Sequence, residues 1–211
     1  TTTVDDCGTC DNKCEFAHAT PRCEANTCKF TCLPGFIDLN GLATDGCEYQ
    51  CTPTSTADRP DLAFTDANCD GLDGEWNQGI FVAPAAGGGS NTNPGTRALP
   101  MASISAAITA AASQGKRDVY VASGTYPGQL TIQNIQGLII AGGYSLPDWR
   151  RSLNNTSTVG PANPGLQIDG ADGGTLQFFT IQGANAITPG ASAYGAWVRN
   201  SAGVRLEGLT V

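Results

Sequence analysis

Residues 66–75, with the sequence DANCDGLDGE, form an acidic run whose spacing could bind a metal ion. Side-chain oxygens at alternate positions, followed by glycine, let a tight turn direct several hard ligands at one point, as Ca²⁺-binding loops do. The expected ligands are Asp66, Asn68 and Asp70, the Leu72 carbonyl, and Asp73 or Glu75. Asn77 occupies the twelfth position in place of glutamate, so the loop departs from an EF-hand. The alternative is a solvated turn.

Nine cysteines lie within the first 69 residues, and none follows them. They are Cys7, Cys10, Cys14, Cys23, Cys28, Cys32, Cys47, Cys51 and Cys69. This density predicts a disulfide framework, because a small module cannot bury enough apolar surface to fold without covalent support. Disulfides persist in oxidising compartments, so the sequence predicts a secreted or cell-surface protein.

Zinc binding and redox chemistry are the alternatives for these cysteines. The spacings of Cys7 with Cys10 and of Cys28 with Cys32 are close to those of zinc ligands, but the remaining cysteines complete no ribbon or finger. No strand–helix junction of the thioredoxin type surrounds Cys7. An odd number leaves one thiol free or joined to another chain, and Cys51 is the expected partner of Cys69. The rest of the connectivity stays open.

The second half of the chain offers few groups for catalysis. Its carboxylates include Asp118, Asp148, Asp169, Asp172 and Glu207. Cleavage of a polysaccharide needs paired carboxylates, or a base beside calcium-binding acids. Asp169 and Asp172 are close in sequence but lie in a predicted turn, and the single histidine, His18, lies among the cysteines. We therefore expect no enzyme, with a polysaccharide lyase or glycoside hydrolase as the alternative.

Aromatic side chains could give the protein a second kind of function. The candidates for a sugar-stacking face are Tyr120, Tyr126, Tyr144, Trp149, Tyr194 and Trp197. The same residues could equally fill a core, and Arg150 and Arg151 beside Trp149 could meet a sugar acid. A polysaccharide-binding protein is therefore an alternative.

Charge divides the chain into two parts. Residues 1–75 carry 14 acidic and four basic side chains, whereas residues 76–211 carry five acidic and seven basic ones. The formal net charge of −8 argues against a nucleic-acid partner, which binds through phosphate neutralisation. No apolar run approaches the ~20 residues of a membrane span. We expect a disulfide-rich module at 1–51, a linker at 52–78 that holds the acidic run, and a second domain at 79–211.

The second domain is predicted to be mainly β, since 27 glycines and 12 prolines among 211 residues favour turn-rich structure. One helix is expected at about 100–114, where Ile104, Ala107, Ile108 and Ala111 follow helical spacing and Gly115 suits the C′ position. The strands after it are short, and each is separated from the next by Gly, Asn, Pro or Asp.

A weak repeat runs through these strands. Leu176, Phe179 and Ile181 recur as Leu206, Leu209 and Val211, each 30 residues later. Regular return of short strands predicts a solenoid, here a parallel β-helix whose first coil the helix covers. A β-sandwich is the alternative.

Several motifs resemble those of a known group. Residues 93–96, 118–126 and 138–144 are similar to the start of a right-handed parallel β-helix family of unknown function, found in predicted surface proteins of myxobacteria and related bacteria. Cys7-Gly8-Thr9-Cys10, Gly35-Phe36 and Asp45-Gly46-Cys47-Glu48 resemble the Cys-rich modules that precede that domain. The resemblance implies the architecture and little about activity.

The two ends of the sequence add to the functional expectation. The chain begins at Thr1, which a cleaved signal or a trimmed precursor explains, and a strand is predicted up to Val211. A strand that ends there leaves an open edge, so we expect the native chain to continue or another subunit to cover it. These features predict an extracellular structural protein, stabilised by calcium, that assembles end to end as a filament or surface-layer subunit.

Overall fold

The computed structural model describes residues 3–133 and 135–211. The chain forms two compact units, the first comprising Thr1–Thr56 and Asp66–Gly71 and the second Ala57–Thr65 and Leu72–Val211. The segment 52–78, expected to be a linker, is therefore divided between the units. The Cys51–Cys69 disulfide joins the acidic run to the first unit, while residues 57–65 pack with the second.

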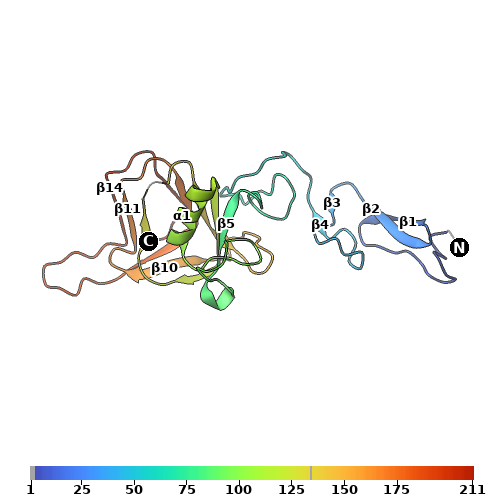
Figure 1. Ribbon diagram of the computed structural model, residues 1–211, viewed down its shortest axis with the longest axis horizontal. Coiled ribbons are helices and arrows are strands. Elements are labelled where there is room, and N and C mark those ends of the chain that lie inside the picture. The colour runs from blue at the N-terminus through green and yellow to red at the C-terminus, as the bar shows by residue number, and fades with distance from the viewer. Residues whose placement is uncertain (1–2, 134) are drawn as a thin grey trace. The chain divides into compact units, whose positions relative to one another are not determined.

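The first unit consists of two small antiparallel sheets (Figure 1). Strands β1 (Ala19–Glu24) and β2 (Thr27–Cys32) form a hairpin, and β3 (Phe36–Ile37) pairs with β4 (Tyr49–Gln50). The hairpin turn is Ala25-Asn26, and both residues have positive φ, as a type I′ turn requires. Among the described residues of this unit, the buried apolar side chains are Cys7, Cys14, Cys47 and Cys69. The disulfides themselves are thus its core.

The described part of the second unit contains parallel strands, one α-helix and a 3₁₀ turn, η1 (Ala85–Gly87). The strands are β5 (Gly79–Val82), β6 (Asp118–Ala122), β7 (Gly124–Tyr126), β8 (Leu130–Ile132), β9 (Ile139–Tyr144), β10 (Ser157–Ala162), β11 (Leu166–Asp169), β12 (Thr175–Gln177), β13 (Phe179–Gly183), β14 (Ala196–Arg199) and β15 (Arg205–Glu207). They form three sheets, in the orders β13-β10-β7, β14-β11-β8 and β15-β12-β9-β6-β5. All of these pairs are parallel, which excludes the antiparallel sandwich.

From β7 onward the chain visits the three sheets in a fixed cyclic order. Each strand from β7 to β12 therefore pairs with the strand that comes three places later in the sequence, such as β8 with β11 and β11 with β14. The repeat expected from the sequence is confirmed at Leu176 and Leu206, which are register partners. Inward side chains from successive strands stack on one another, as Ile140 does on Leu176. This stacking forms the apolar core of the unit.

The predicted helix is confirmed, with a later start than expected. Helix α1 (Ile104–Gln114) buries Ile104, Ala107, Ile108 and Ala111, the four residues that helical spacing had placed on one face. The Ser103 hydroxyl caps it by accepting a hydrogen bond from the Ala106 N–H (3.2 Å). Gly115, with φ of 64°, ends it in the left-handed conformation. The helix does not reach back to residue 100, because Met101 forms a bridge with Val82 of β5.

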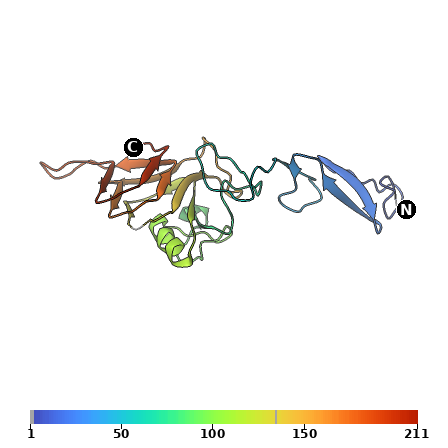
Figure 2. The ribbon, with the colours of Figure 1, turned by 90° about the horizontal axis from the view of Figure 1, so that it is seen from above.

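Helix α1 packs against β5, β6 and β8, three of the first four strands of the second unit, and it is the green helix of Figure 2. Its four buried side chains join the core that Val119, Val121 and Leu130 line. Within residues 3–133 and 135–211, no helix has the length and apolar character that crossing a membrane requires.

Candidate functional site

The cysteines form four disulfides, as expected. They are Cys7–Cys23, Cys14–Cys28, Cys32–Cys47 and Cys51–Cys69, and each joins residues 14 to 18 positions apart. The last pair is the one that the sequence predicted. Cys10 is the cysteine without a disulfide partner, and it is exposed.

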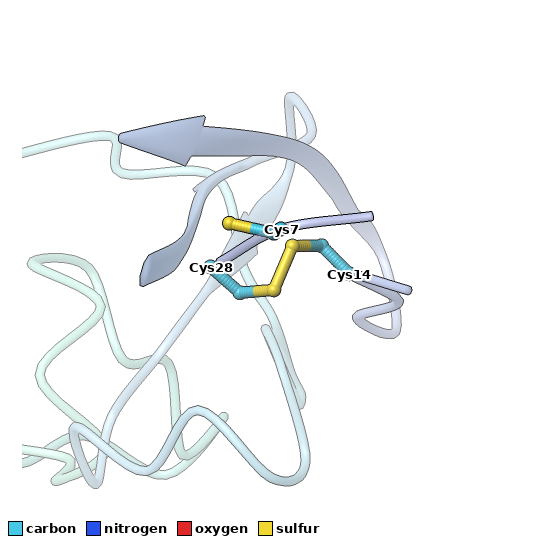
Figure 3. Close-up of side chains that lie close together, drawn as sticks. All are labelled: Cys7, Cys14 and Cys28. Carbon is cyan, nitrogen blue, oxygen red and sulfur yellow. A yellow bond between two sulfur atoms is a disulfide. The ribbon is translucent and has the colours of Figure 1, made fainter. Parts of the chain in front are cut away.

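The sulfur atoms of Cys7, Cys14 and Cys28 lie within 4.8 Å of one another (Figure 3). A zinc site would need thiolates at these positions. Cys14 is instead bonded to Cys28, and Cys7 is bonded to Cys23. The cluster therefore consists of two neighbouring disulfides and is not a zinc site.

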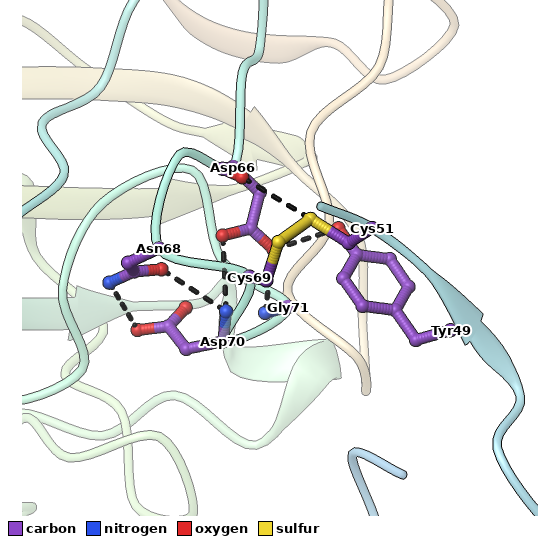
Figure 4. Close-up of a disulfide and its surroundings, with 7 residues drawn as sticks. All are labelled: Tyr49, Cys51, Asp66, Asn68, Cys69, Asp70 and Gly71. Carbon is purple, nitrogen blue, oxygen red and sulfur yellow. Dashed lines mark hydrogen bonds between the residues drawn. A yellow bond between two sulfur atoms is a disulfide. The ribbon is translucent and has the colours of Figure 1, made fainter. Parts of the chain in front are cut away.

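The three side chains expected as calcium ligands lie together in the first unit (Figure 4). The Asp66 carboxylate accepts hydrogen bonds from the Asp70 N–H (3.1 Å), the Gly71 N–H (2.8 Å) and the Tyr49 hydroxyl (2.7 Å). Asn68 accepts from the Asp70 N–H (3.1 Å) and donates to the Asp70 carboxylate (2.9 Å). These contacts close a tight turn at Gly71, whose φ is 88°.

The carboxylates expected to complete the calcium shell have other partners in the second unit. Asp73 forms an ion pair with Arg151 (2.5 Å) and accepts from the Asp61 N–H (3.1 Å). Glu75 forms an ion pair with Arg117 (2.8 Å), and the Leu72 side chain is fully buried. The structure thus brings Asp66, Asn68 and Asp70 together. Asp73 and Glu75 instead form ion pairs with Arg151 and Arg117.

Calcium binding stays a prediction, and it should depend on the side chains of the loop. We expect the wild-type chain to bind Ca²⁺ weakly, in the range of about 10⁻⁴–10⁻³ M typical of extracellular modules, and Asp70→Ala to remove the binding. Isothermal titration calorimetry measures both. Asp172→Ala, which removes an exposed acid in the second unit, is the control. Equal heats from wild type and Asp70→Ala would show that the loop is a hydrogen-bonded turn without a metal.

A second buried carboxylate lies in the second unit. Asp118 is completely buried, 3.2 Å from Arg59 Nη2 and 3.7 Å from Arg117 Nε. The Tyr120 hydroxyl lies 3.3 Å from it and accepts the Glu75 N–H (2.9 Å). Burial raises the pKa of Asp118, and the two arginines oppose that rise. The ion pair between Arg59 and Asp118 connects residues 57–65 to strand β6.

Three further carboxylates of this unit, Asp148, Asp169 and Glu207, each have a polar neighbour. Asp169 accepts hydrogen bonds from the Asn200 amide (2.9 Å) and from Arg199 Nε (2.9 Å). These contacts lower the pKa of Asp169, whereas a catalytic acid needs a raised one. Asp148 lies 4.0 Å from Arg150, and Glu207 accepts from the Gln177 amide (3.0 Å). Each of these carboxylates therefore interacts with a neighbouring polar side chain.

The aromatic residues considered for sugar stacking fall into two groups. Four of them, Tyr120, Tyr126, Tyr144 and Trp149, are buried and fill the core. Trp149 is 1% exposed and packs edge-on against Phe81, with ring centroids 4.8 Å apart. A sugar therefore cannot stack on these four rings.

The other two aromatic side chains, Tyr194 and Trp197, are exposed and stack on each other with ring centroids 5.8 Å apart. The Arg199 guanidinium lies 4.8 Å from the centre of the Trp197 ring. Of the two arginines expected to meet a sugar acid, Arg151 is buried and only Arg150 is exposed. Residues 149–151 thus do not form the sugar site that their sequence suggested.

No family model, curated protein or solved structure matched this chain. The resemblance to bacterial surface proteins therefore stays a prediction from the motifs.

Proposed function

We propose that this chain is an extracellular structural protein and not an enzyme, and that its second unit is a right-handed parallel β-helix that pairs with a second copy. The disulfide core of the first unit supports an oxidising location. The cyclic order in which the chain visits three parallel sheets supports the β-helix. A right-handed coil is favoured because about 98% of connections between parallel strands of one sheet have that hand.

The observation that carries the pairing is the apolar surface that β14 and β15 expose within the described residues. Val198 and Leu206 occupy inward positions there, and they are 44% and 42% exposed. Their register partners in the preceding layer, Ile168 and Leu176, are fully buried. Among the described strands, β14 pairs only with β11 and β15 only with β12. Such an edge offers both backbone groups and apolar surface to an added strand.

The opposite edge of the largest sheet, at β5, is already covered. The Phe81 N–H donates to the Gly95 carbonyl (2.9 Å), and the Met101 N–H donates to the Phe81 carbonyl (2.9 Å). Head-to-tail stacking, which would build the filament expected from the sequence, needs this edge to be free. We therefore propose a two-fold pair in which the β14–β15 layers of two copies meet.

Sedimentation equilibrium over a wide concentration range tests the pairing. We expect reversible dimerisation that Val198→Lys with Leu206→Lys weakens at least tenfold, because each lysine places a charge in the apolar contact. Ile187→Lys is the matched control, since Ile187 is 96% exposed and lies outside this layer. A wild-type chain that stays monomeric at every concentration, or equal weakening by Ile187→Lys, would overturn the proposal.

A further inference from the structure

A cleft of about 470 Å³ opens beside the first strand of the second unit. Its lining includes β5 residues, the segment 94–97 and the end of α1. The side chains that give it chemical character are Trp76, Asn77, Thr96, Arg97, Gln114 and Lys116. We call it the Arg97 cleft. Its lining contains two basic side chains and no acidic one.

The two cations of the Arg97 cleft have no acidic partner among the described residues. The protein has 19 acidic and 11 basic side chains, and most basic residues of the second unit form ion pairs. Within residues 3–133 and 135–211, Arg97 and Lys116 form no ion pair. Both line the same cleft, so the cleft carries two positive charges and no negative one although the net charge of the chain is −8.

Aromatic stacking holds the Arg97 guanidinium in place. Its central carbon lies 4.2 Å from the centre of the Trp76 ring. Trp76 in turn stacks on the buried Phe81, with centroids 5.7 Å apart and planes 14° apart. Arg97 donates no hydrogen bond within the part of the chain that the structure describes. The flat face of the guanidinium thus rests on the Trp76 ring, and the N–H donors at its edge are available to an oxyanion.

Lys116 adds a second cation, and its ammonium does not bond to the carbonyls at the end of α1. Its ammonium donates to the Asn77 carbonyl (2.6 Å). The Ala111 and Ala112 carbonyls in the last turn of α1 accept instead from the Gly115 and Lys116 N–H groups. An ammonium has three donors, so two remain for a ligand.

The shape of the surface favours an extended ligand. Arg97 also lines a second cleft of about 380 Å³, together with Gly88, Pro100, Leu146 and Pro147. A peptide cannot bind here by strand addition, because residues 95–101 already bond to the outer edge of β5. A saccharide needs no such edge, since its rings pack on flat apolar groups while its hydroxyls bond to side chains such as Gln114 and Thr96.

We propose that the Arg97 cleft binds an acidic polysaccharide, with a uronate carboxylate on Arg97 and Lys116. A carboxylate suits the planar guanidinium because it can accept two parallel hydrogen bonds. The sugar rings on either side of that uronate lie in the two clefts that meet at Arg97. The proposal does not depend on pairing through the β14–β15 layer.

Calorimetric titration of the full chain with a tetramer of galacturonic acid at low salt tests this site. We expect binding that weakens about tenfold or more in Arg97→Gln and in Lys116→Gln, because each change removes a charge-assisted hydrogen bond. Affinity should also fall as salt is added. Arg205→Gln is the matched control, since it removes the same charge from β15, at the edge of the sheet opposite β5.

The neutral methyl ester of the same tetramer separates charge recognition from general sugar binding. Failure of the wild type to bind the acidic tetramer, equal binding of the ester, or an equal loss in Arg205→Gln would overturn the proposal. Thermal unfolding of each variant identifies any loss of fold. Lys116→Gln leaves the stacking of Arg97 on Trp76 intact. It therefore tests the site even if Arg97→Gln lowers the stability of the fold.

Discussion

Replacing Arg151 with methionine is expected to lower the free energy of unfolding of the second unit by about 3–5 kcal/mol, the usual cost of removing one partner of a buried ion pair. The Arg151 guanidinium side chain is fully buried, 2.5 Å from the Asp73 carboxylate. It also donates to the Asp61 carbonyl (2.8 Å) and the Gly142 carbonyl (2.9 Å). Methionine retains the apolar stem but removes the guanidinium donor from all three acceptors.

The effect of Arg151→Met should depend on pH. Burial raises the pKa of Asp73 from 3.8 to about 7, and the guanidinium opposes that rise. Between these two values the folded protein keeps a proton that the unfolded chain loses, so this acid favours folding most below about pH 4 and progressively less up to about pH 7. Without Arg151 the pKa rises further, and the decline of stability extends to higher pH.

Urea unfolding followed by tryptophan fluorescence at pH 8 measures the change. Arg150→Met is the matched control, because Arg150 is exposed and lies 4.0 Å from Asp148. An exposed pair of this kind contributes about 0–1 kcal/mol. A loss in Arg151→Met no larger than in Arg150→Met would contradict a structural role for the buried pair.

Reduction of the disulfides is expected to unfold the first unit and to leave the second folded. Each bridge contributes roughly 2–4 kcal/mol, and the described part of the first unit has no buried apolar side chains other than cysteines. The second unit contains no cysteine and rests on a packed apolar core. Hydrogen exchange with and without reductant should therefore show loss of protection in β1 and β2 and unchanged protection in β6, β9 and β12.

Two controls make this result interpretable. Alkylation after reduction must label all nine cysteines, which shows that the bridges were opened. Cys10→Ser under oxidising conditions should behave like the wild type, because Cys10 takes part in no disulfide. Protection of β1 and β2 that survives complete reduction would show that the unit folds without its bridges.

Local patterns in the sequence were sufficient for several elements of the structure. The spacing of Ile104, Ala107, Ile108 and Ala111 predicted which helix face is buried, because a helix brings residues three and four apart onto one side. The 30-residue repeat predicted that Leu206 lies beside Leu176. The Asp-x-Asn-x-Asp-Gly spacing predicted that Asp66, Asn68 and Asp70 close one turn, since the hydrogen bonds among these three residues span only two to four positions.

The sequence by itself therefore determined the mainly β composition, the helix face, the turn at residues 66–71 and the presence of a disulfide core. Only the tertiary structure decided which acids meet which arginines, because Asp73 and Arg151 are 78 residues apart and the folding of the chain around its sheets brings them together. The same holds for the burial of Trp149 and for the meeting of Arg97, Trp76 and Lys116 in one cleft. Local patterns depend on the geometry of one helix, strand or turn, whereas these contacts depend on how segments distant in sequence pack together.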